Sequence, residues 1–297
     1  MDPVVSALRA ASSTIGRAPY PVANNLGRGV ALAAARRSPQ ARRVVARNLR
    51  RIKGDQPDRL IRQREVQQVF DSYARYWVDV LRLPHMSPNA VERGFKTEGY
   101  EYIEEACENG TAPIVGMPHL GGWEWATPWM VGRGYEVSAV VEELDSVEMY
   151  EWFREFREGL GVNVIPLDSR ASTELASAIA QGHVICLLCD RDISGAGVEV
   201  EFFGEVTRLP GGPALMALRT GAPLLPGAIY FEGSGCRGVI RPPLDTERRG
   251  KLREDVQRVT QDMAKELEIL IRRAPLQWHL LQPNWPSDYE ALGMDPP

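Results

Sequence analysis

Two segments of this 297-residue chain carry residues whose types and spacing could do chemistry. In the first, an apolar run ending near Met117 is followed by His119, by the pair Gly121–Gly122 and by Glu124. The glycines allow a tight turn, so Glu124 can fold back toward His119. A carboxylate at one imidazole nitrogen fixes the tautomer and stabilises the ring after the other nitrogen has taken a proton. The spacing therefore predicts a general base; alternatively, His119 only ends a strand and Glu124 favours a helix N-terminus.

The second chemical segment follows the apolar run VICLLC and begins with three charged residues, Asp190, Arg191 and Asp192. Charges at the end of an apolar strand are costly to bury unless they have partners or a function. Arg191, or Arg208 further along the chain, could hold a phosphate, because a guanidinium group binds one bidentately. The alternative is an Asp–Arg pair on the surface.

The elements that must position these residues alternate between short apolar runs and helical patterns after residue 110. This alternation predicts an α/β fold with a largely parallel sheet flanked by helices, in which ligands gather past the carboxyl ends of strands. Residues 1–90 are predicted to form a basic, amphipathic helical layer and residues 91–297 the α/β core, and the two are expected to form a single integrated unit. The expected strands are 112–117, 135–141, 162–167, 183–189, 198–203 and 223–231, and the expected helices among them are 123–131, 146–160, 171–182, 211–221 and 248–273.

The charge of the chain is unevenly distributed. Its net charge is −4, yet the first 64 residues carry 14 Lys and Arg against three acids, a net charge of +11. Such asymmetry indicates an anionic partner surface, a membrane or a nucleic acid, unless the arginines form a solvated helix face. Residues 41–52 combine arginines with an aliphatic stripe, which either lies in a lipid headgroup layer or packs on the rest of the protein.

Composition excludes several classes of protein. With 44% apolar and 25% charged residues the chain is ordinary globular protein, and no apolar stretch reaches the 18 residues of a membrane span. The N-terminus lacks the pattern of a secretory signal. Cys186 and Cys189 form a C-x-x-C inside an apolar strand with no second pair at zinc spacing, and no second His accompanies His119, so we expect no metal site.

Together these segments resemble the lysophospholipid acyltransferase superfamily, whose signature is H-x4-[DE], here His119 to Glu124. Within it the chain resembles the branch of lipid A lauroyl/myristoyl acyltransferases, and in particular the actinobacterial phosphatidylinositol mannoside acyltransferases. Those enzymes carry Asp at the position of Glu124 and Glu at that of Asp190, so the charges are kept. The matching segments extend from about residue 40 to about 286 and include 43–51, 72–77, 119–124, 190–192, 202–204, 210–214, 278–279 and 281–283.

The resemblance implies that a long-chain acyl-CoA, such as palmitoyl-CoA, donates its acyl group to a sugar hydroxyl of a membrane glycolipid, the mannose of a phosphatidylinositol mannoside. His119 would be the general base and Glu124 would orient it; neither a covalent acyl-enzyme nor a cofactor is expected. The acceptor side would comprise Glu142, Arg157, Asp190, Arg191 and Asp192. The donor side would comprise Trp123, Phe203 and Arg208. Trp125, Trp129 and Met130 are further candidates for the wall of an acyl slot, or ordinary core residues, and His279 could line the site from the C-terminal tail.

The resemblance also implies a peripheral protein on the cytoplasmic face of the plasma membrane, held on anionic lipid by its basic N-terminal helices, with no nucleic-acid partner. Two alternatives stay open. The same fold could acylate a different lipid or glycoside, or the protein could be a non-catalytic membrane-binding module whose basic helices are the active part.

Overall fold

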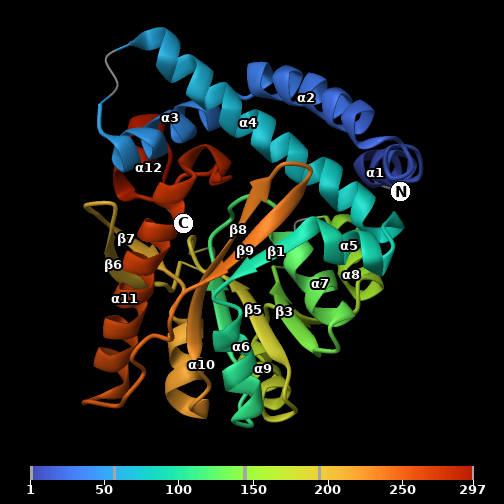
Figure 1. The fold of residues 1–297 in the computed structure, drawn as a ribbon. Helices are drawn as coiled ribbons and strands as arrows, with labels where there is room; N and C mark the ends of the chain where they lie inside the picture. Colours follow the sequence, from blue (N-terminus) through green and yellow to red (C-terminus); the bar gives the residue numbers. More distant parts are fainter. Residues whose placement is uncertain (1–2, 56–57, 143–145, 193–194, 296–297) are drawn as a thin grey trace.

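A seven-stranded sheet lies at the centre of the computed structural model, which describes residues 3–55, 58–142, 146–192 and 195–295 (Figure 1). Its strand order is β1-β9-β8-β2-β5-β3-β4, and every neighbouring pair is parallel except β8–β9. The predicted, largely parallel α/β sheet is thereby confirmed. Its strands are β1 (Phe95–Glu98), β2 (Ile114–Met117), β3 (Val137–Val141), β4 (Val162–Pro166), β5 (Val184–Leu188), β8 (Leu224–Glu232) and β9 (Gly235–Ile240).

The run expected as a strand at 198–203 lies outside this sheet. It forms β6 (Val198–Phe202), which pairs with β7 (Glu205–Leu209) in a separate antiparallel hairpin. The hairpin turns at Phe203–Gly204, where Phe203 has φ +52° and is the one non-glycine residue with a positive φ among those described. Strands β1, β7 and β9 were not among the expected strands, because their sequences are short or polar on one side.

Central strands β2 and β5 read as continuous apolar runs because helices cover both faces of the sheet. Alternate side chains of β2 enter two separate cores: Ile114 packs with the helices of one face, and Val115 and Met117 with those of the other. The first face is covered by α9 (Ala171–Ala180), α10 (Gly212–Thr220) and α11 (Leu252–Arg273). The second is covered by α5 (Pro88–Gly94), α6 (Glu101–Glu108), α7 (Ala126–Gly132) and α8 (Val147–Gly159).

Four helices at the N-terminus form the layer at the top of Figure 1: α1 (Pro3–Ile15), α2 (Tyr20–Arg37), α3 (Pro39–Lys53) and α4 (Arg59–Arg82). The aliphatic stripe of α3 does not face a headgroup layer: Val45 and Leu49 are buried and pack with Val66, Val69 and Phe70 of α4. The second alternative for residues 41–52, packing on the rest of the protein, is therefore the one the structure adopts. The division of the chain near residue 90 stays a prediction, and α5 spans it.

The C-terminal segment returns to the middle of the molecule after α11. It contains two short helices, η3 (Pro275–Gln277) and α12 (Pro286–Leu292), and Trp285 between them is fully buried. Arg51 of α3 donates to the buried carboxylate of Asp288 at 2.7 Å and to the exposed carboxylate of Glu205 at 2.9 Å. These two ion pairs connect α3 with α12 and with the β6–β7 hairpin. Two further short helices are η1 (Leu83–His85) and η2 (Trp123–Trp125).

Candidate active site

A cavity of about 810 Å³ opens at the carboxyl ends of the central strands. His119 follows β2, Glu142 follows β3, and Arg191 follows β5, and all three line this cavity. The parallel strands β2, β5 and β3 are neighbours, so their carboxyl ends meet at one edge of the sheet, where ligands of α/β proteins bind. Sequence segments more than 70 residues apart are brought together in this way.

The imidazole of His119 is held by Asp190. Its Nδ1 lies 2.6 Å from Oδ1 of Asp190, while its main-chain N–H donates to Oδ2 of the same carboxylate at 3.0 Å. Asp190 is fully buried, whereas the His119 side chain is 26% exposed. The carboxylate is therefore behind the ring, and the ring is at the cavity wall.

Asp190 is ionised in this setting. Burial opposes its charge, but the adjacent His119 and the N–H groups of His119 and Trp278 hold the pKa of Asp190 below its ordinary value. An ionised carboxylate only accepts hydrogen bonds, so the proton of the 2.6 Å contact is on Nδ1 of His119. In the neutral ring this leaves the lone pair on Nε2, which can take a proton from a substrate.

The predicted pairing of His119 with Glu124 is wrong, because Glu124 is bound elsewhere. Gly121, with φ +61°, turns the chain, and η2 directs Glu124 toward α4 and α8. There Arg157 donates to Glu124 at 2.6 Å and the Tyr76 hydroxyl donates to it at 3.3 Å. Burial opposes the charge of Arg157, but the Glu124 carboxylate raises the pKa of Arg157 above its ordinary value.

Removing the charge of Glu124 is expected to destabilise the fold. In Glu124→Gln the guanidinium of Arg157, 16% exposed, loses its counter-charge, which costs about 3 kcal/mol for a buried pair. Urea unfolding checks this, with Glu155→Gln as the control. Glu155 also pairs with an arginine, Arg9, but both side chains are more than half exposed, so that variant should unfold like the wild type. Equal midpoints for the two variants would contradict the prediction.

The residues assigned to the acceptor side divide into three groups. Arg191 donates to Glu142 at 3.0 Å, and Asp192, which accepts from the Gly197 N–H, lines the same cavity. Arg157 also lines the cavity but is paired with Glu124. Asp190 is a correction: it is fully buried behind His119 and does not line the cavity, so it cannot contact an acceptor.

Two residues assigned to the donor side lie elsewhere. Phe203 packs in the core with its ring 5.7 Å from that of Trp278, because the hairpin turn directs it inward. Arg208 is exposed on β7, where it bonds the Gly195 carbonyl at 3.0 Å, and it is not part of the cavity wall. Trp123 does line the cavity, with its ring 5.4 Å from that of His119.

Comparison with known proteins identifies the family. The profile of the bacterial lipid A biosynthesis acyltransferase family matches residues 4–287. The chain belongs to this family. A phosphatidylinositol mannoside acyltransferase of Mycolicibacterium smegmatis is 37% identical over 266 residues, which cover 88% of this chain and 84% of that protein. The proteins of the same name from two Mycobacterium tuberculosis strains, CDC 1551 and H37Rv, are 38% and 37% identical over 223 residues, 73% of this chain and 69% of theirs. The predicted resemblance is confirmed, and the chain is an acyltransferase.

One residue of this acyltransferase site, His279, was expected only as a lining residue. Its Nε2 lies 2.8 Å from the Ser72 hydroxyl, and its main-chain N–H donates to the His119 carbonyl at 2.7 Å. Burial, with the nearby His119, lowers the pKa of His279 to about 3, so its ring is neutral. Segments 72–77 and 278–279 match the family, but no sequence pattern indicated which contacts Ser72 and His279 make.

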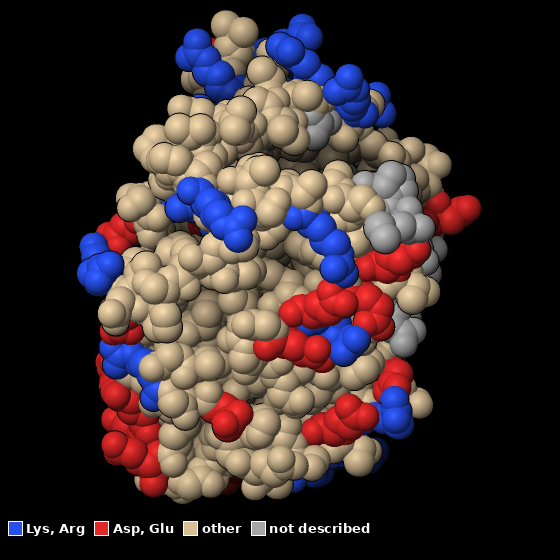
Figure 2. All heavy atoms as spheres, turned by 90° about the vertical axis from the view of Figure 1, so that its right-hand side faces the viewer, with Lys and Arg blue, Asp and Glu red and all other residues tan. Residues whose placement is uncertain are grey.

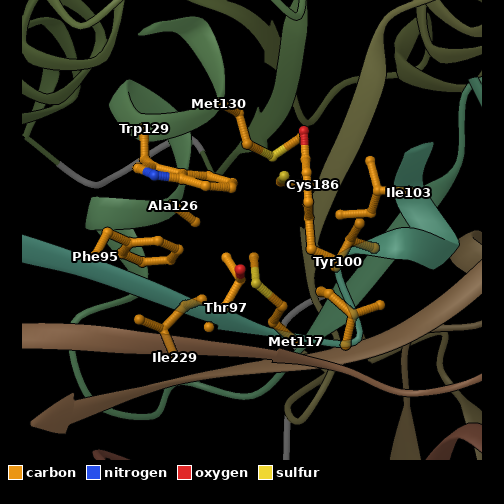
Figure 3. A pocket seen from close by; sticks show the side chains of 13 residues that line it. Phe95, Thr97, Tyr100, Ile103, Met117, Ala126, Trp129, Met130, Cys186 and Ile229 are labelled. Carbon is orange, nitrogen blue, oxygen red and sulfur yellow. The ribbon is translucent and has the colours of Figure 1, made fainter. Parts of the chain in front are cut away.

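A second, small cavity lies beside this acyltransferase site. Its volume is about 30 Å³, roughly that of one water molecule, and aromatic, aliphatic and sulfur-containing side chains form its wall (Figure 3). Trp129, Met130 and Met117 point into it, and Met117 is only two residues before His119. Trp125 is not part of either wall; its indole N–H donates to Asp79 at 3.0 Å.

In the described ranges of this acyltransferase, no three His, Cys, Asp or Glu side chains gather as metal ligands would. Within those same ranges, no helix combines the length and the apolar character that crossing a bilayer requires.

Proposed function

We propose that this protein transfers the acyl group of a long-chain acyl-CoA to a sugar hydroxyl of a glycolipid, the mannose of a phosphatidylinositol mannoside. The observation that carries the proposal is the His119–Asp190 pair at the wall of the 810 Å³ cavity in a member of an acyltransferase family. The names of three relatives support the mannoside acceptor.

The proposed reaction needs one base and no covalent enzyme intermediate. Nε2 of His119 takes the proton of the sugar hydroxyl as its oxygen bonds the thioester carbonyl carbon. The carbon–sulfur bond then breaks, and the leaving CoA thiolate receives the proton from His119. Asp190 stays ionised throughout and stabilises the imidazolium that forms between the two proton transfers.

The acyl chain is proposed to enter the apolar region around the small cavity. At about 30 Å³ that cavity is too small for a long chain, so side chains must move to admit one. Met117 and Met130 in its wall are unbranched and adapt easily to a new shape. The sugar is proposed to lie in the large cavity near Glu142 and Arg191, which carry hydrogen-bonding groups suited to hydroxyls and phosphate.

The surface proposed to meet the cytoplasmic face of the membrane is the outer side of α2. Val22, Leu26 and Val30 lie four residues apart on one face of this helix and are 51%, 57% and 69% exposed. Residues 3–54 contain no Asp or Glu, and Lys and Arg side chains gather at the end of the molecule where the N-terminal helices lie (Figure 2). An apolar stripe flanked by cations suits an anionic lipid surface.

Replacing this stripe is expected to weaken membrane binding. The triple variant Val22→Ser, Leu26→Ser, Val30→Ser should bind vesicles of phosphatidylcholine and phosphatidylinositol about 10–100-fold more weakly than the wild type. Vesicle sedimentation measures this. The double variant Val206→Ser, Ile269→Ser is the control, since these exposed residues belong to β7 and α11, which lie away from α2 (Figure 1). Unchanged binding of the triple variant would place the membrane contact elsewhere.

The function itself is tested by mixing the purified protein with palmitoyl-CoA and a phosphatidylinositol mannoside and analysing the lipids by mass spectrometry. We expect a product heavier by one palmitoyl group and an equal amount of free CoA. Transfer only to another glycolipid would reject the mannoside acceptor, and vesicle binding with no transfer to any acceptor would favour the non-catalytic alternative.

A further inference from the structure

The carboxylate of Asp190 is held from behind by a residue of the C-terminal segment. The indole Nε1–H of Trp278 donates to Oδ2 of Asp190 at 2.7 Å, beside the main-chain N–H of His119 at 3.0 Å. With Oδ2 occupied by two donors, Oδ1 is the oxygen left to face Nδ1 of His119. Trp278 is 3% exposed and does not line the cavity, so it cannot contact a substrate.

The main chain around Trp278 also holds the loop that carries His119. The Gly121 N–H donates to the Gln277 carbonyl at 2.9 Å, and the His279 N–H donates to the His119 carbonyl at 2.7 Å. These two bonds flank the antiparallel bridge between Leu120 and Trp278. One short segment thus fixes the backbone beneath the imidazole and, through the Trp278 side chain, the carboxylate beside it.

Aromatic side chains packed against the Trp278 ring restrain its position. Its neighbours are Phe202 and Phe203, with ring centroids 6.1 Å and 5.7 Å away. Phe203 takes the left-handed backbone conformation at φ +52°, which is unfavourable for a bulky side chain and places its ring in the core. Glu268 of α11 accepts a hydrogen bond from the Phe203 N–H at 2.6 Å and holds that turn.

We propose that Trp278 is a positioning residue for proton transfer: its indole N–H fixes the Asp190 carboxylate so that the carboxylate can orient His119. This inference rests on the proposed role of His119 as the base. It gives the C-terminal segment, which lies nearly 90 residues after Asp190, a role in orienting the catalytic residues.

The variant that isolates this hydrogen bond is Trp278→Phe, which keeps an aromatic ring in the core but removes the N–H. We expect kcat for acyl transfer to fall about 10–100-fold, as for loss of other groups that orient a catalytic ligand, with KM for acyl-CoA and for the mannoside unchanged. The Trp278 N–H stabilises the ionised form of Asp190, so loss of this donor raises the pKa of Asp190. The acidic limb of the plot of rate against pH should therefore move to higher pH. The other titratable groups facing Asp190 are His119, His279 and Cys189, and the substitution leaves them in place.

Trp285→Phe is the matched control. Trp285 is also a buried indole of the C-terminal segment stacked on Phe202, but its N–H donates to the Phe202 carbonyl at 3.1 Å and not to the site. Both variants should melt at lower temperature than the wild type, and only Trp278→Phe should change kcat and the acidic limb. Wild-type kinetics in Trp278→Phe, or equal losses of kcat in both variants, would overturn the proposal.

A measurement without substrate separates this inference from the proposed function. In protein labelled with ¹⁵N at histidine, the short Nδ1–H bond of His119 to Asp190 should give a low-field proton signal that is absent in His119→Ala. We expect the signal to shift or broaden in Trp278→Phe and to persist in Trp285→Phe. If the wild type transfers no acyl group, the proposed function fails, and an unchanged signal in Trp278→Phe would independently reject the role of Trp278.

Discussion

Replacing His119 by alanine is expected to lower kcat of acyl transfer by about 10²–10⁴-fold, because the sugar hydroxyl then loses the base that takes its proton. The fold should survive, since the His119 side chain is partly exposed at the cavity wall and packs in neither core. Initial rates with radiolabelled palmitoyl-CoA and a saturating mannoside measure the loss. The KM values should change little, because the ring acts on the reacting proton more than on binding.

The matched control is His85→Ala. His85 is an exposed histidine at η1, bonded to Ser12, and lies away from the cavity, so its loss should leave kcat at the wild-type value. Turnover of His119→Ala at the wild-type rate would remove the base from the proposed reaction. Equal losses in both histidine variants would point to a general effect of the substitution on the fold.

Much of the fold follows from local sequence pattern. Continuous apolar runs such as VICLL predicted the central strands, since parallel strands covered on both faces are apolar throughout. The same pattern could not distinguish β6 from a sheet strand, because its place in a separate hairpin depends on its contacts with α11 and the C-terminal segment. For α3 the sequence left two environments open, and only its packing on α4 decided between them.

Part of the candidate site could likewise be predicted from the sequence, and part of it could not. Sequence could place His119 and Asp190 at strand ends, and the adjacency of β2 and β5 brings them together. It predicted Glu124 as the partner of His119 and assigned Asp190 to the acceptor side, because Glu124 is the nearer carboxylate along the chain. The buried Arg157 decides the matter: a guanidinium in that position needs a counter-charge, and Glu124 supplies it. Trp278 lies in a segment that matches the family, but no sequence pattern indicated its contact with Asp190, which is 88 residues away.

Replacing Asp190 by asparagine is expected to cost about 10³–10⁴ in kcat while barely changing the size of the side chain. Two donors, Trp278 Nε1–H and the His119 N–H, both point at the Oδ2 position, so the amide oxygen of the asparagine must occupy it. The amide NH₂ then faces Nδ1 of His119 and donates to it. The imidazole proton is forced onto Nε2, the atom that must accept the proton of the sugar, and the base is lost with the ring still in place.

A control variant is needed to separate the effect of the His119 tautomer on kcat from the effect of losing a buried charge on stability. Asp288→Asn is the control, because Asp288 is equally buried and pairs with Arg47 and Arg51, and none of these three residues lines the cavity. That variant should lower the midpoint of urea unfolding and leave kcat unchanged, whereas Asp190→Asn should lower kcat far more than the loss of folded protein can explain. Wild-type kcat in Asp190→Asn would show that Asp190 does not set the tautomer of His119. Since Asp190 is the carboxylate within 2.6 Å of the ring, the structure favours the large loss.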